Sequence, residues 1–404
     1  MAEPTAKKAP LALDGVRVLA LEVSVSGPHC SRILGDMGAE VIKIEKPRGG
    51  DDSRRMGPPF IKGESAAFLA INRNKRSLAL DLKQLAGQAI FRRLADRADI
   101  LVENFRPGTL DALGLGFTDL AAEHPELIYC SISGYGQTGP DRVRGGYDLV
   151  AQGAAGLMSI TGHPGQPPVK VGVPVADLNA GMYAAYGVLC AYIHRLKTGQ
   201  GQYVDTSLLE AGLAYTVWES AMFFATGVTP PPMGSAHRLA APYQAFKTSD
   251  GYINIGAANQ ANWELLCEAL GRPELVTDPR YPDNAARTRA APELAHGLEQ
   301  TFSLRSTRDW LERMEAAGVP AGPVNDMAAA YADAQVQARN MMVELEHPTA
   351  GRIKHIGVPV KLSRTPGSVR QPAPTLGQHT DEVLTELGLT PAEIAALRAE
   401  RVVS

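Results

Sequence analysis

An aspartate at the start of an apolar helix is the residue of this sequence best placed to do chemistry. Asp177 ends the segment Val171-Gly-Val-Pro-Val-Ala-Asp177, between a run of branched residues and a predicted helix that continues to about Lys197. Its carboxylate could cap that helix, because an N-cap side chain accepts hydrogen bonds from the free N–H groups of the first turn. It could instead be a nucleophile at a strand-to-helix turn, kept ionised by the positive helix end. The local pattern favours the cap and leaves the nucleophile open.

The sequence lacks the patterns that are typical of three other kinds of site. The first turn reads Glu22-Val-Ser-Val-Ser-Gly-Pro28, without the glycines of a dinucleotide fingerprint, which disfavours a nicotinamide enzyme. No G-x-S-x-G elbow marks a serine hydrolase. The nine histidines contain no HExxH or HxH pair, so no metal site is expected.

The four cysteines, which form no CxxC pair, are expected to be buried free thiols of a reducing cytosol: Cys30, Cys130, Cys190 and Cys267.

Many basic residues follow predicted strands. This set comprises Lys46, Arg48, Arg54, Arg55, Arg73, Lys75, Arg76, Lys83 and Arg106. Arginine and lysine donate charge-assisted hydrogen bonds to phosphates, so the set could bind a phosphate-rich ligand. The alternative is a solvated rim of the sheet.

The bulk composition describes an ordinary soluble protein of 404 residues, with 45% hydrophobic and 21% charged residues. A net charge of −3 gives no attraction to nucleic acid or to an anionic membrane. The segment Met1–Pro10 is followed by no apolar region of the kind that signal peptides have. The apolar run 181–193 is shorter than the ~20 residues that span a bilayer, and we expect a buried helix there. These features predict a cytoplasmic protein with no nucleic-acid or membrane partner.

Strand and helix patterns alternate along the first half of the chain. Predicted strands lie at residues 16–21, 41–45, 77–82, 100–103 and 127–133, with helices at 27–37 and 85–97. Such alternation predicts a mostly parallel sheet with helices on both faces. Ligands of such sheets collect beyond the carboxyl ends of the strands, where residues 134–141 form a predicted loop. After Pro230-Pro-Pro232 the pattern changes to strand-turn-strand over 243–256, which indicates a second, smaller α/β domain.

Short motifs in one order along nearly the whole chain resemble the family III CoA-transferases, the group of formyl-CoA transferase and of the carnitine and bile-acid CoA-transferases. Among them are Leu34-Gly-Asp-Met-Gly-Ala-Glu40, Asn72-Arg-Asn-Lys-Arg-Ser77, Val102-Glu-Asn-Phe-Arg-Pro-Gly108, Gly134-Tyr-Gly-Gln-Thr-Gly-Pro140 and Leu376-Gly-Gln-His-Thr-Asp-Glu382. Each motif is weak alone, but their order is specific.

The resemblance implies an α/β fold and an interlocked homodimer. It predicts that residues 1–225 form the N-terminal part of a large Rossmann-like, CoA-binding domain with a mostly parallel sheet. Residues 226–330 are then a small central α/β domain, and residues 331–404 a linker and the return to the large domain.

The resemblance also assigns the site residues, with Asp177 as the catalytic aspartate. Including candidates from the basic set, the expected CoA-binding residues are Val25, Ser26, Lys46, Arg73, Lys75, Leu80, Lys83, Asn104, Phe105, Arg106, Tyr147 and Asp148. Val25 departs from formyl-CoA transferase, which has a glutamine there. Ala112 replaces a CoA-contacting arginine of the family, for which Arg106 is a candidate substitute. Residues 233–238 replace the polyglycine loop of the oxalate-specific member, so oxalate is not the expected substrate.

The implied reaction moves CoA from an acyl-CoA to a free carboxylic acid through an anhydride and a CoA thioester on Asp177. CoA is then a substrate, and no tightly bound cofactor is expected. The substrate region looks most like succinyl-CoA:dicarboxylate transferases of the glutarate type, with His237 and Arg238 as candidates for the distal carboxylate. Two alternatives are an α-methylacyl-CoA racemase of the same fold and a non-catalytic CoA-binding protein. Similar racemases have a histidine where this chain has Tyr147, a poor base at neutral pH, which favours the transferase.

Overall fold

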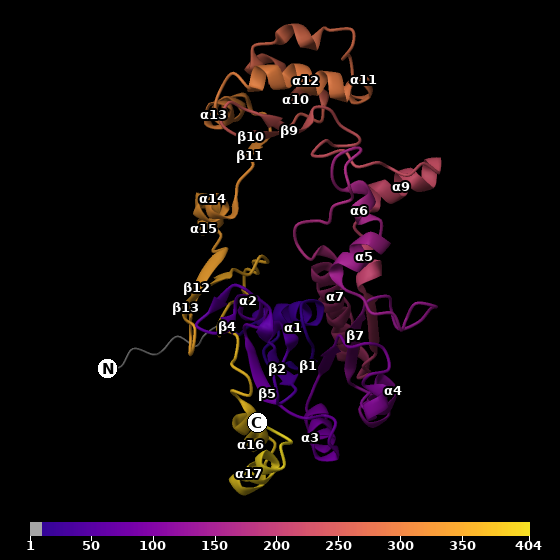
Figure 1. Cartoon of the computed structure of the whole chain (residues 1–404), viewed down its shortest axis with the longest axis vertical. Helices are drawn as coiled ribbons and strands as arrows, with labels where there is room; N and C mark the ends of the chain where they lie inside the picture. Colours follow the sequence, from indigo (N-terminus) through magenta and orange to yellow (C-terminus); the bar gives the residue numbers. More distant parts are fainter. Residues whose placement is uncertain (1–9) are drawn as a thin grey trace, which may run out of the picture. The chain divides into compact units, whose positions relative to one another are not determined.

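The computed structural model describes residues 10–404, which form two compact units (Figure 1). Unit 1 comprises residues 10–158, Lys170–Gly227 and Ala334–Ser404. Unit 2 comprises Ser159–Val169 and Val228–Asp333. The expectation about a signal peptide concerns residues that lie outside the described part of the chain, Pro10 excepted.

A six-stranded parallel sheet organises unit 1, in the order β5-β2-β1-β6-β7-β8. Its strands are β1 (Arg17–Leu21), β2 (Glu40–Glu45), β5 (Lys75–Ala79), β6 (Ile100–Glu103), β7 (Ile128–Ser133) and β8 (Tyr203–Ser207). The parallel α/β fold class is confirmed. β5 begins two residues earlier than predicted, because Lys75 already pairs with Val41 of β2.

Helices cover both faces of this sheet, since successive residues of a strand point to opposite faces. Val18 and Ala20 of β1 join the core under α1 (Ser26–Asp36) and α7 (Val175–Thr198), which lie side by side in Figure 1. Leu19 and Leu21 join the core on the other face, with α3 (Leu85–Ala95), α4 (Phe117–Glu123), α16 (Thr380–Glu386) and α17 (Pro391–Ala399).

The end of the described chain completes the second of these cores. Val402 and Val403 are buried in it, and Val403 forms a β-bridge with Leu80 directly after β5. The backbone N–H of Asp81 donates to the Val402 carbonyl at 2.8 Å. In Figure 1 the yellow helix α16 lies next to the end of the violet β5, and α17 packs against α16. Segments more than 300 residues apart in the chain therefore build one core.

Unit 1 also contains elements outside this sheet and the helices that cover it. They are η1 (Asp52–Arg55), β3 (Phe60–Ile61), β4 (Glu64–Ser65), α2 (Ala66–Ile71), η2 (Asp111–Leu113), α5 (Asp148–Ala154), α8 (Leu208–Leu213), α9 (Val217–Thr226), α15 (Ala334–Ala338), β12 (Met342–His347) and β13 (Gly351–Ile356). Helix α6 (Leu157–Ile160) follows α5 in the chain.

Unit 2 is a small α/β unit around a three-stranded antiparallel sheet, β11 (Ala321–Pro323), β10 (Tyr252–Gly256) and β9 (Tyr243–Lys247). Its core stacks Phe246 on Phe302 and packs Trp310 against Phe302 edge-on. Its helical elements are α10 (Gln260–Leu270), η3 (Pro273–Val276), α11 (Asn284–Arg289), α12 (Ala291–Phe302), α13 (Thr307–Ala317) and α14 (Met327–Ala332). The β9–β10 hairpin confirms the strand-turn-strand prediction.

Helix α7 differs from its prediction in two ways. No strand precedes it, and it begins at Val175 with Pro174 as N-cap, so Asp177 is its third residue. The expectation of a buried helix is wrong for one face, where Tyr186 is 65% and Leu196 70% exposed. The buried face consists mostly of small residues that let α1 approach closely: a Cβ on Gly181 would lie 2.5 Å from the Ser26 carbonyl oxygen. Within residues 10–404, no helix has the length and apolar character needed to cross a membrane.

Candidate active site

A cavity of about 590 Å³ lies in unit 1, where the chain leaves the carboxyl ends of β1, β6 and β7. Parallel α/β sheets bind their ligands at this edge. The cavity is lined by Val23, Ser24, Val25, Ser26, Met56, Asn104, Phe105, Arg106, Pro107, Ile132, Ser133, Gly134, Arg144, Gly145, Gly146, Tyr147, Asp148, Leu149, Lys170, Pro174, Asp177 and Leu208. It thus brings together Asp177 with the expected CoA-binding residues of three separate segments, 25–26, 104–106 and 147–148.

Asp148, and not Asp177, satisfies the first turn of α7. Asp148 begins α5, and its Oδ1 atom accepts the backbone N–H of Ala176 at 2.9 Å and that of Asp177 at 3.5 Å. Its Oδ2 atom accepts a bond of 2.7 Å from the Gln152 side chain, which in turn accepts the N–H of Val171. The N-cap interpretation of Asp177 is therefore wrong. The Asp177 carboxylate, half-buried at the cavity wall, is left for another role.

Burial raises the pKa of Asp177 from 3.8 to about 7, and the negative charge of Asp148 adds to the rise. This argues against the expectation that the positive helix end keeps the carboxylate ionised, because desolvation and a like charge both favour the protonated form. Both protonation states are populated near neutral pH. Perturbation of this kind in a cavity is typical of catalytic groups.

The loop Val23–Ser26 forms one wall of the cavity and is held by Asn104, which follows β6. The Asn104 side-chain oxygen accepts the Val23 N–H at 2.8 Å. Its amide nitrogen donates to the Val23 carbonyl at 2.8 Å and to the Ser26 hydroxyl at 3.1 Å. Asn104 therefore fixes the conformation of this loop in addition to lining the cavity.

Three exposed cations, Arg106, Arg144 and Lys170, line the cavity. Arg144 pairs with Asp141 at 3.0 Å, and the Lys170 ammonium donates to the Val171 carbonyl at 3.2 Å. Only Arg106 was expected from the sequence. Arg144 and Lys170 could have been found by their position in the sequence, because they lie in loops that lead directly into Tyr147 and Val171.

The other expected CoA-binding residues of unit 1 lie outside the cavity lining. Lys46 is exposed and pairs with Asp52 at 2.9 Å, and Lys83 is also exposed. Leu80 is buried in the core under α3 and α16.

Arg73 and Lys75 are buried, and each is paired with a carboxylate. Arg73 binds Asp36 at 2.7 Å, and Lys75 binds Glu22 at 2.6 Å. Neither cation reaches the protein surface, where a phosphate could meet it, which argues against both as CoA contacts.

The rest of the basic set mostly forms ion pairs within the protein. Arg54 pairs with Glu45, Arg55 with Asp52, and Arg76 with Glu40, Glu382 and Glu386. Because these cations are already paired with carboxylates, they fit the interpretation as a solvated rim of the sheet better than the interpretation as a phosphate-binding site.

The two candidate substrate residues belong to unit 2. The backbone N–H of His237 donates to the Tyr243 carbonyl at 3.0 Å, and the two rings pack with their centroids 5.0 Å apart. The Nδ1 atom of His237 accepts the N–H of Leu239 at 3.0 Å. Arg238 is half-buried next to it.

The thiols are partly as expected. Cys30, Cys130 and Cys267 are buried and free, whereas Cys190 is exposed on α7. In the part of the chain that the structure describes, no three His, Cys, Asp or Glu side chains gather in a way that could hold a metal ion.

The sequence model of CoA-transferase family III matches residues 13–380. The chain belongs to this family. Its relatives include succinyl-CoA:glutarate CoA-transferase of Homo sapiens, 42% identical over 93% of this chain and 86% of the relative. Succinate–glutarate CoA-transferase of Agrobacterium fabrum is 40% identical over 93% of this chain and 95% of the relative. The crystal structure of a CAIB/BAIF family protein from Brucella suis is 38% identical, with a TM-score of 0.85 over 94% of this chain and all of that chain.

These likenesses confirm the family and the enzyme class expected from the sequence: the protein is a family III CoA-transferase. They also confirm the α/β fold class. A CoA-transferase works on CoA thioesters and carboxylic acids, so a cavity that combines a carboxylate with cations at one edge of the sheet suits the chemistry of the family.

Proposed function

We propose that this CoA-transferase moves CoA from succinyl-CoA to a dicarboxylic acid of the glutarate type, with Asp177 as the nucleophile. The observation that carries the proposal is the Asp177 carboxylate, half-buried in a cavity that is lined by the segments expected to contact CoA. Two relatives at about 40% identity support the choice of substrates: one is named a succinyl-CoA:glutarate CoA-transferase and the other a succinate–glutarate CoA-transferase.

The proposed reaction has four steps, and each replaces one acyl bond by another. An Asp177 oxygen attacks the thioester carbon of succinyl-CoA; the C–S bond breaks, which leaves a mixed anhydride and the CoA thiolate. The thiolate attacks the Asp177 carbonyl carbon and releases succinate, which forms an aspartyl-CoA thioester. The acceptor carboxylate then attacks this thioester and releases the thiolate again. Attack of the thiolate on the acceptor's carbonyl gives the new acyl-CoA and restores Asp177.

The residues around Asp177 have separate proposed tasks. Asp148 holds the backbone at Ala176 and Asp177, so that the nucleophile stays fixed while its acyl partner changes. Val25, Ser26, Asn104, Phe105, Arg106 and Tyr147 contact the CoA moiety. Lys46, Leu80 and Lys83 remain predicted CoA contacts on the strength of the resemblance. His237 and Arg238 of unit 2 bind the distal carboxylate of the acceptor.

Tyr147 argues against the racemase alternative. It lines the cavity at the position where similar racemases have a histidine, and a phenol is a poorer general base than an imidazole at neutral pH. A non-catalytic CoA-binding protein would have no need for a cavity carboxyl group whose pKa burial raises to about 7.

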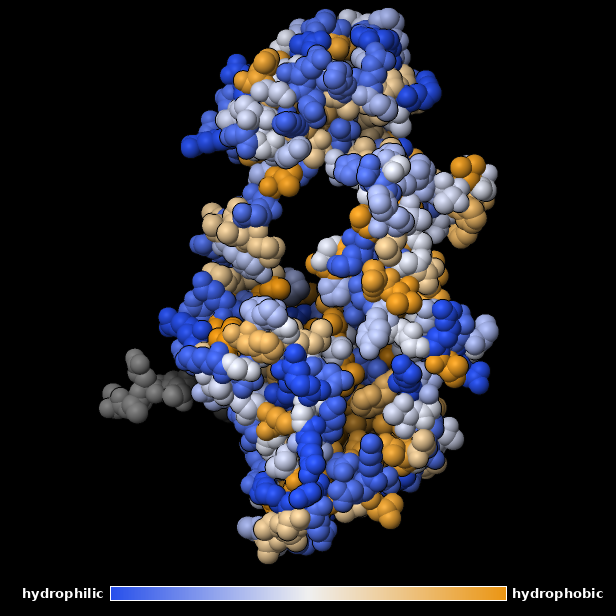
Figure 2. Space-filling model, viewed as in Figure 1, coloured by the Kyte–Doolittle hydropathy of each residue, from blue (hydrophilic) through white to orange (hydrophobic). Residues whose placement is uncertain are grey.

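The proposed partner of the chain is a second, interlocked copy. Exposed hydrophobic side chains follow one another along α7 and α9, and Figure 2 shows hydrophobic residues at the surface over α9. They are Met182, Tyr183, Tyr186, Ile193, Leu196, Val217, Phe223 and Phe224. Runs of this kind usually mark an interface, whereas single exposed apolar residues are normal. Light scattering should give the mass of a dimer. The cytoplasmic location stays a prediction.

Covalent trapping tests the function. The enzyme is incubated with succinyl-CoA without an acceptor and then treated with borohydride or hydroxylamine, and its peptides are analysed by mass spectrometry. Borohydride should reduce the activated Asp177 carbonyl to an alcohol, and hydroxylamine should convert it to a hydroxamate. Asp177→Asn should carry neither modification. An unmodified wild-type enzyme that nevertheless turns over succinyl-CoA would overturn the covalent mechanism, and solvent deuterium at the substrate α-carbon would point to the racemase.

A further inference from the structure

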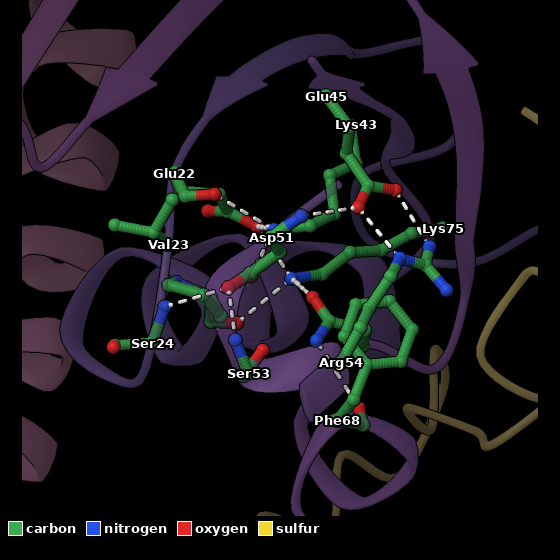
Figure 3. A network of polar contacts seen from close by, with 12 residues as sticks. Glu22, Val23, Ser24, Lys43, Glu45, Asp51, Ser53, Arg54, Phe68 and Lys75 are labelled. Carbon is green, nitrogen blue, oxygen red and sulfur yellow. Dashed lines mark hydrogen bonds and ion pairs between the residues drawn. The ribbon is translucent and has the colours of Figure 1, made fainter. Parts of the chain in front are cut away.

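A network of buried charges lies directly beneath the cavity loop Val23–Ser26 (Figure 3). Four of its members are the cations Lys43 of β2 and Lys75 of β5 and the carboxylates Glu22 and Asp51. All four side chains are almost completely buried. Burial of charges is unfavourable unless each charge is closely paired, and apolar side chains often replace buried ion pairs without loss of stability. Packing alone therefore does not explain why this network carries charges.

The distances show how tightly Asp51 is held. Its Oδ2 atom lies 2.9 Å from the Lys43 ammonium, which also donates to the Glu22 carbonyl at 2.9 Å. The Lys75 ammonium binds Glu22 Oε1 at 2.6 Å. Asp51 is also the N-cap of η1, and its Oδ1 atom accepts the Ser53 N–H at 2.8 Å. One oxygen of Asp51 thus faces the buried cation, and the other is directed at backbone N–H groups.

The Oδ1 atom of Asp51 also accepts the backbone N–H of Ser24 at 3.1 Å. Ser24 has a φ of +61°, in the left-handed region that residues other than glycine rarely adopt. It lines the cavity together with Val23, Val25 and Ser26. Asn104 holds the loop at Val23 and Ser26, and the Val25 carbonyl accepts the His29 N–H at 2.8 Å at the start of α1. Asp51 adds the hydrogen bond at Ser24, the residue of the loop that has a positive φ.

We propose that Asp51, held in place by Lys43, is a positioning residue for acyl-CoA binding. It keeps Ser24 in the left-handed conformation and thereby presents the loop Val23–Ser26 to the CoA moiety. The inference rests on the proposed function, because the loop affects turnover in this way only if the cavity binds acyl-CoA. Asp51 lies outside the cavity lining and acts through Ser24.

A purely structural role for the network predicts a different outcome. In that case, loss of Asp51 lowers the melting temperature and the amount of active enzyme, but the remaining folded enzyme binds CoA normally. A positioning role predicts weaker CoA binding by the folded enzyme, and partial recovery when residue 24 can adopt a positive φ without help.

The test compares CoA binding by calorimetry and steady-state kinetics of full-length variants. Asp51→Ala should weaken CoA binding and raise the acyl-CoA KM about tenfold, because the loop loses the charged acceptor at Ser24 and its binding-competent conformation becomes less populated. The acceptor KM and the kcat at saturating acyl-CoA should change less than about twofold. Adding Ser24→Gly to Asp51→Ala should recover part of the lost affinity, because glycine adopts positive φ readily.

Asp36→Ala is the matched control. It removes another buried carboxylate of unit 1, one that binds Arg73 and Asn74. It should lower the melting temperature and leave the affinity for CoA unchanged. If Asp51→Ala does not fold, Asp51→Asn retains one acceptor oxygen and should raise the acyl-CoA KM about threefold.

Asp51 variants that fold and bind CoA as tightly as the wild type would overturn the inference. A double variant, Asp51→Ala with Ser24→Gly, that binds CoA no more tightly than Asp51→Ala would overturn it as well. A wild-type enzyme that neither binds CoA nor catalyses CoA exchange would overturn the proposed function, and this inference with it.

Discussion

One carboxylate oxygen of Asp148 accepts the backbone N–H groups of both Ala176 and Asp177, so two acidic residues from different helices meet at the first turn of α7. The contact couples two effects. Asp148 orders the backbone that carries the proposed nucleophile, and its charge also helps to raise the pKa of the Asp177 carboxyl group. Separate measurements can distinguish these effects.

Transfer activity should depend on pH with a midpoint near 7. Attack on the thioester requires ionised Asp177, whose pKa burial raises to about 7. The value of kcat/KM should therefore fall about tenfold for each pH unit below 6.5 and reach a plateau above 8. Initial rates between pH 5 and 8.5 would show this. A profile that is flat down to pH 5 would contradict the raised pKa of the nucleophile.

Asp177→Asn should inactivate the enzyme and stabilise it. The folded-state pKa of Asp177 lies above its ordinary 3.8, so its stabilising contribution is complete below pH 4 and is lost as the pH rises through 7. Removal of the charge should raise the free energy of unfolding at pH 8 by roughly 1–3 kcal/mol. Activity should fall about a thousandfold or more. Urea unfolding of both proteins checks the sign, and the difference in stability should shrink towards pH 4.5.

Asp148→Asn should move the pH profile to lower values. The amide oxygen can still accept the N–H groups of Ala176 and Asp177, but the charge that helps to raise the pKa of Asp177 is gone. Asp148→Ala should cause the same shift and in addition cost about 1 kcal/mol of stability through the lost cap.

Asp326→Ala removes the N-cap side chain of α14 in unit 2 and serves as the control for the Asp148 variants. It should lower stability by a similar amount without shifting the pH profile. An unshifted profile in Asp148→Asn would show that Asp148 acts on Asp177 through the backbone alone.

The candidate residues for the distal carboxylate can be separated by acceptor. His237→Ala and Arg238→Ala should each raise the KM for glutarate about tenfold, since a bond to a charged group is lost. The KM for a monocarboxylic acid of equal length should not change. If Lys170→Ala shows this pattern instead, the distal carboxylate is bound by a cation of the cavity in unit 1.

The close approach of α1 and α7 predicts a severe effect of one methyl group. A Cβ at Gly181 would lie 2.5 Å from the Ser26 carbonyl oxygen, so Gly181→Ala should destabilise the protein by about 1–3 kcal/mol. Gly297 of α12 has open space around its Cβ position, and Gly297→Ala should stabilise unit 2 by about 0.5–1 kcal/mol. Thermal unfolding compares the two, and a stabilised Gly181→Ala would mean that α1 can move away from α7.

The strands of unit 1 could be predicted because a parallel sheet that is buried on both faces requires short runs of branched apolar residues. Strand β6 lies where the sequence indicated it, and β7 begins one residue later than predicted. Part of the cavity lining was also predictable: seven of the twelve expected CoA-binding residues line it, and motif residues such as Asn104 and Tyr147 follow strand ends or precede helices.

Pairing across the chain could not be predicted. Sequence patterns do not show that Lys75 meets Glu22, or that Asp148 takes the capping role expected of Asp177, because these partners lie 53 and 29 residues apart. The exposed face of α7 was missed for another reason: apolar residues surround the whole helix, which is also the pattern of a buried helix.

The β-bridge between Leu80 and Val403 has a consequence for biosynthesis. A ribosome makes β5 early, but the helices and the two valines that cover that end of the sheet emerge only after all of unit 2 has been translated. Unit 2 can collapse first, while the nascent sheet keeps apolar surface open to solvent. Such a delay exposes a chain to aggregation. We therefore expect this protein to depend on a chaperone more strongly during its synthesis than during refolding of the complete chain.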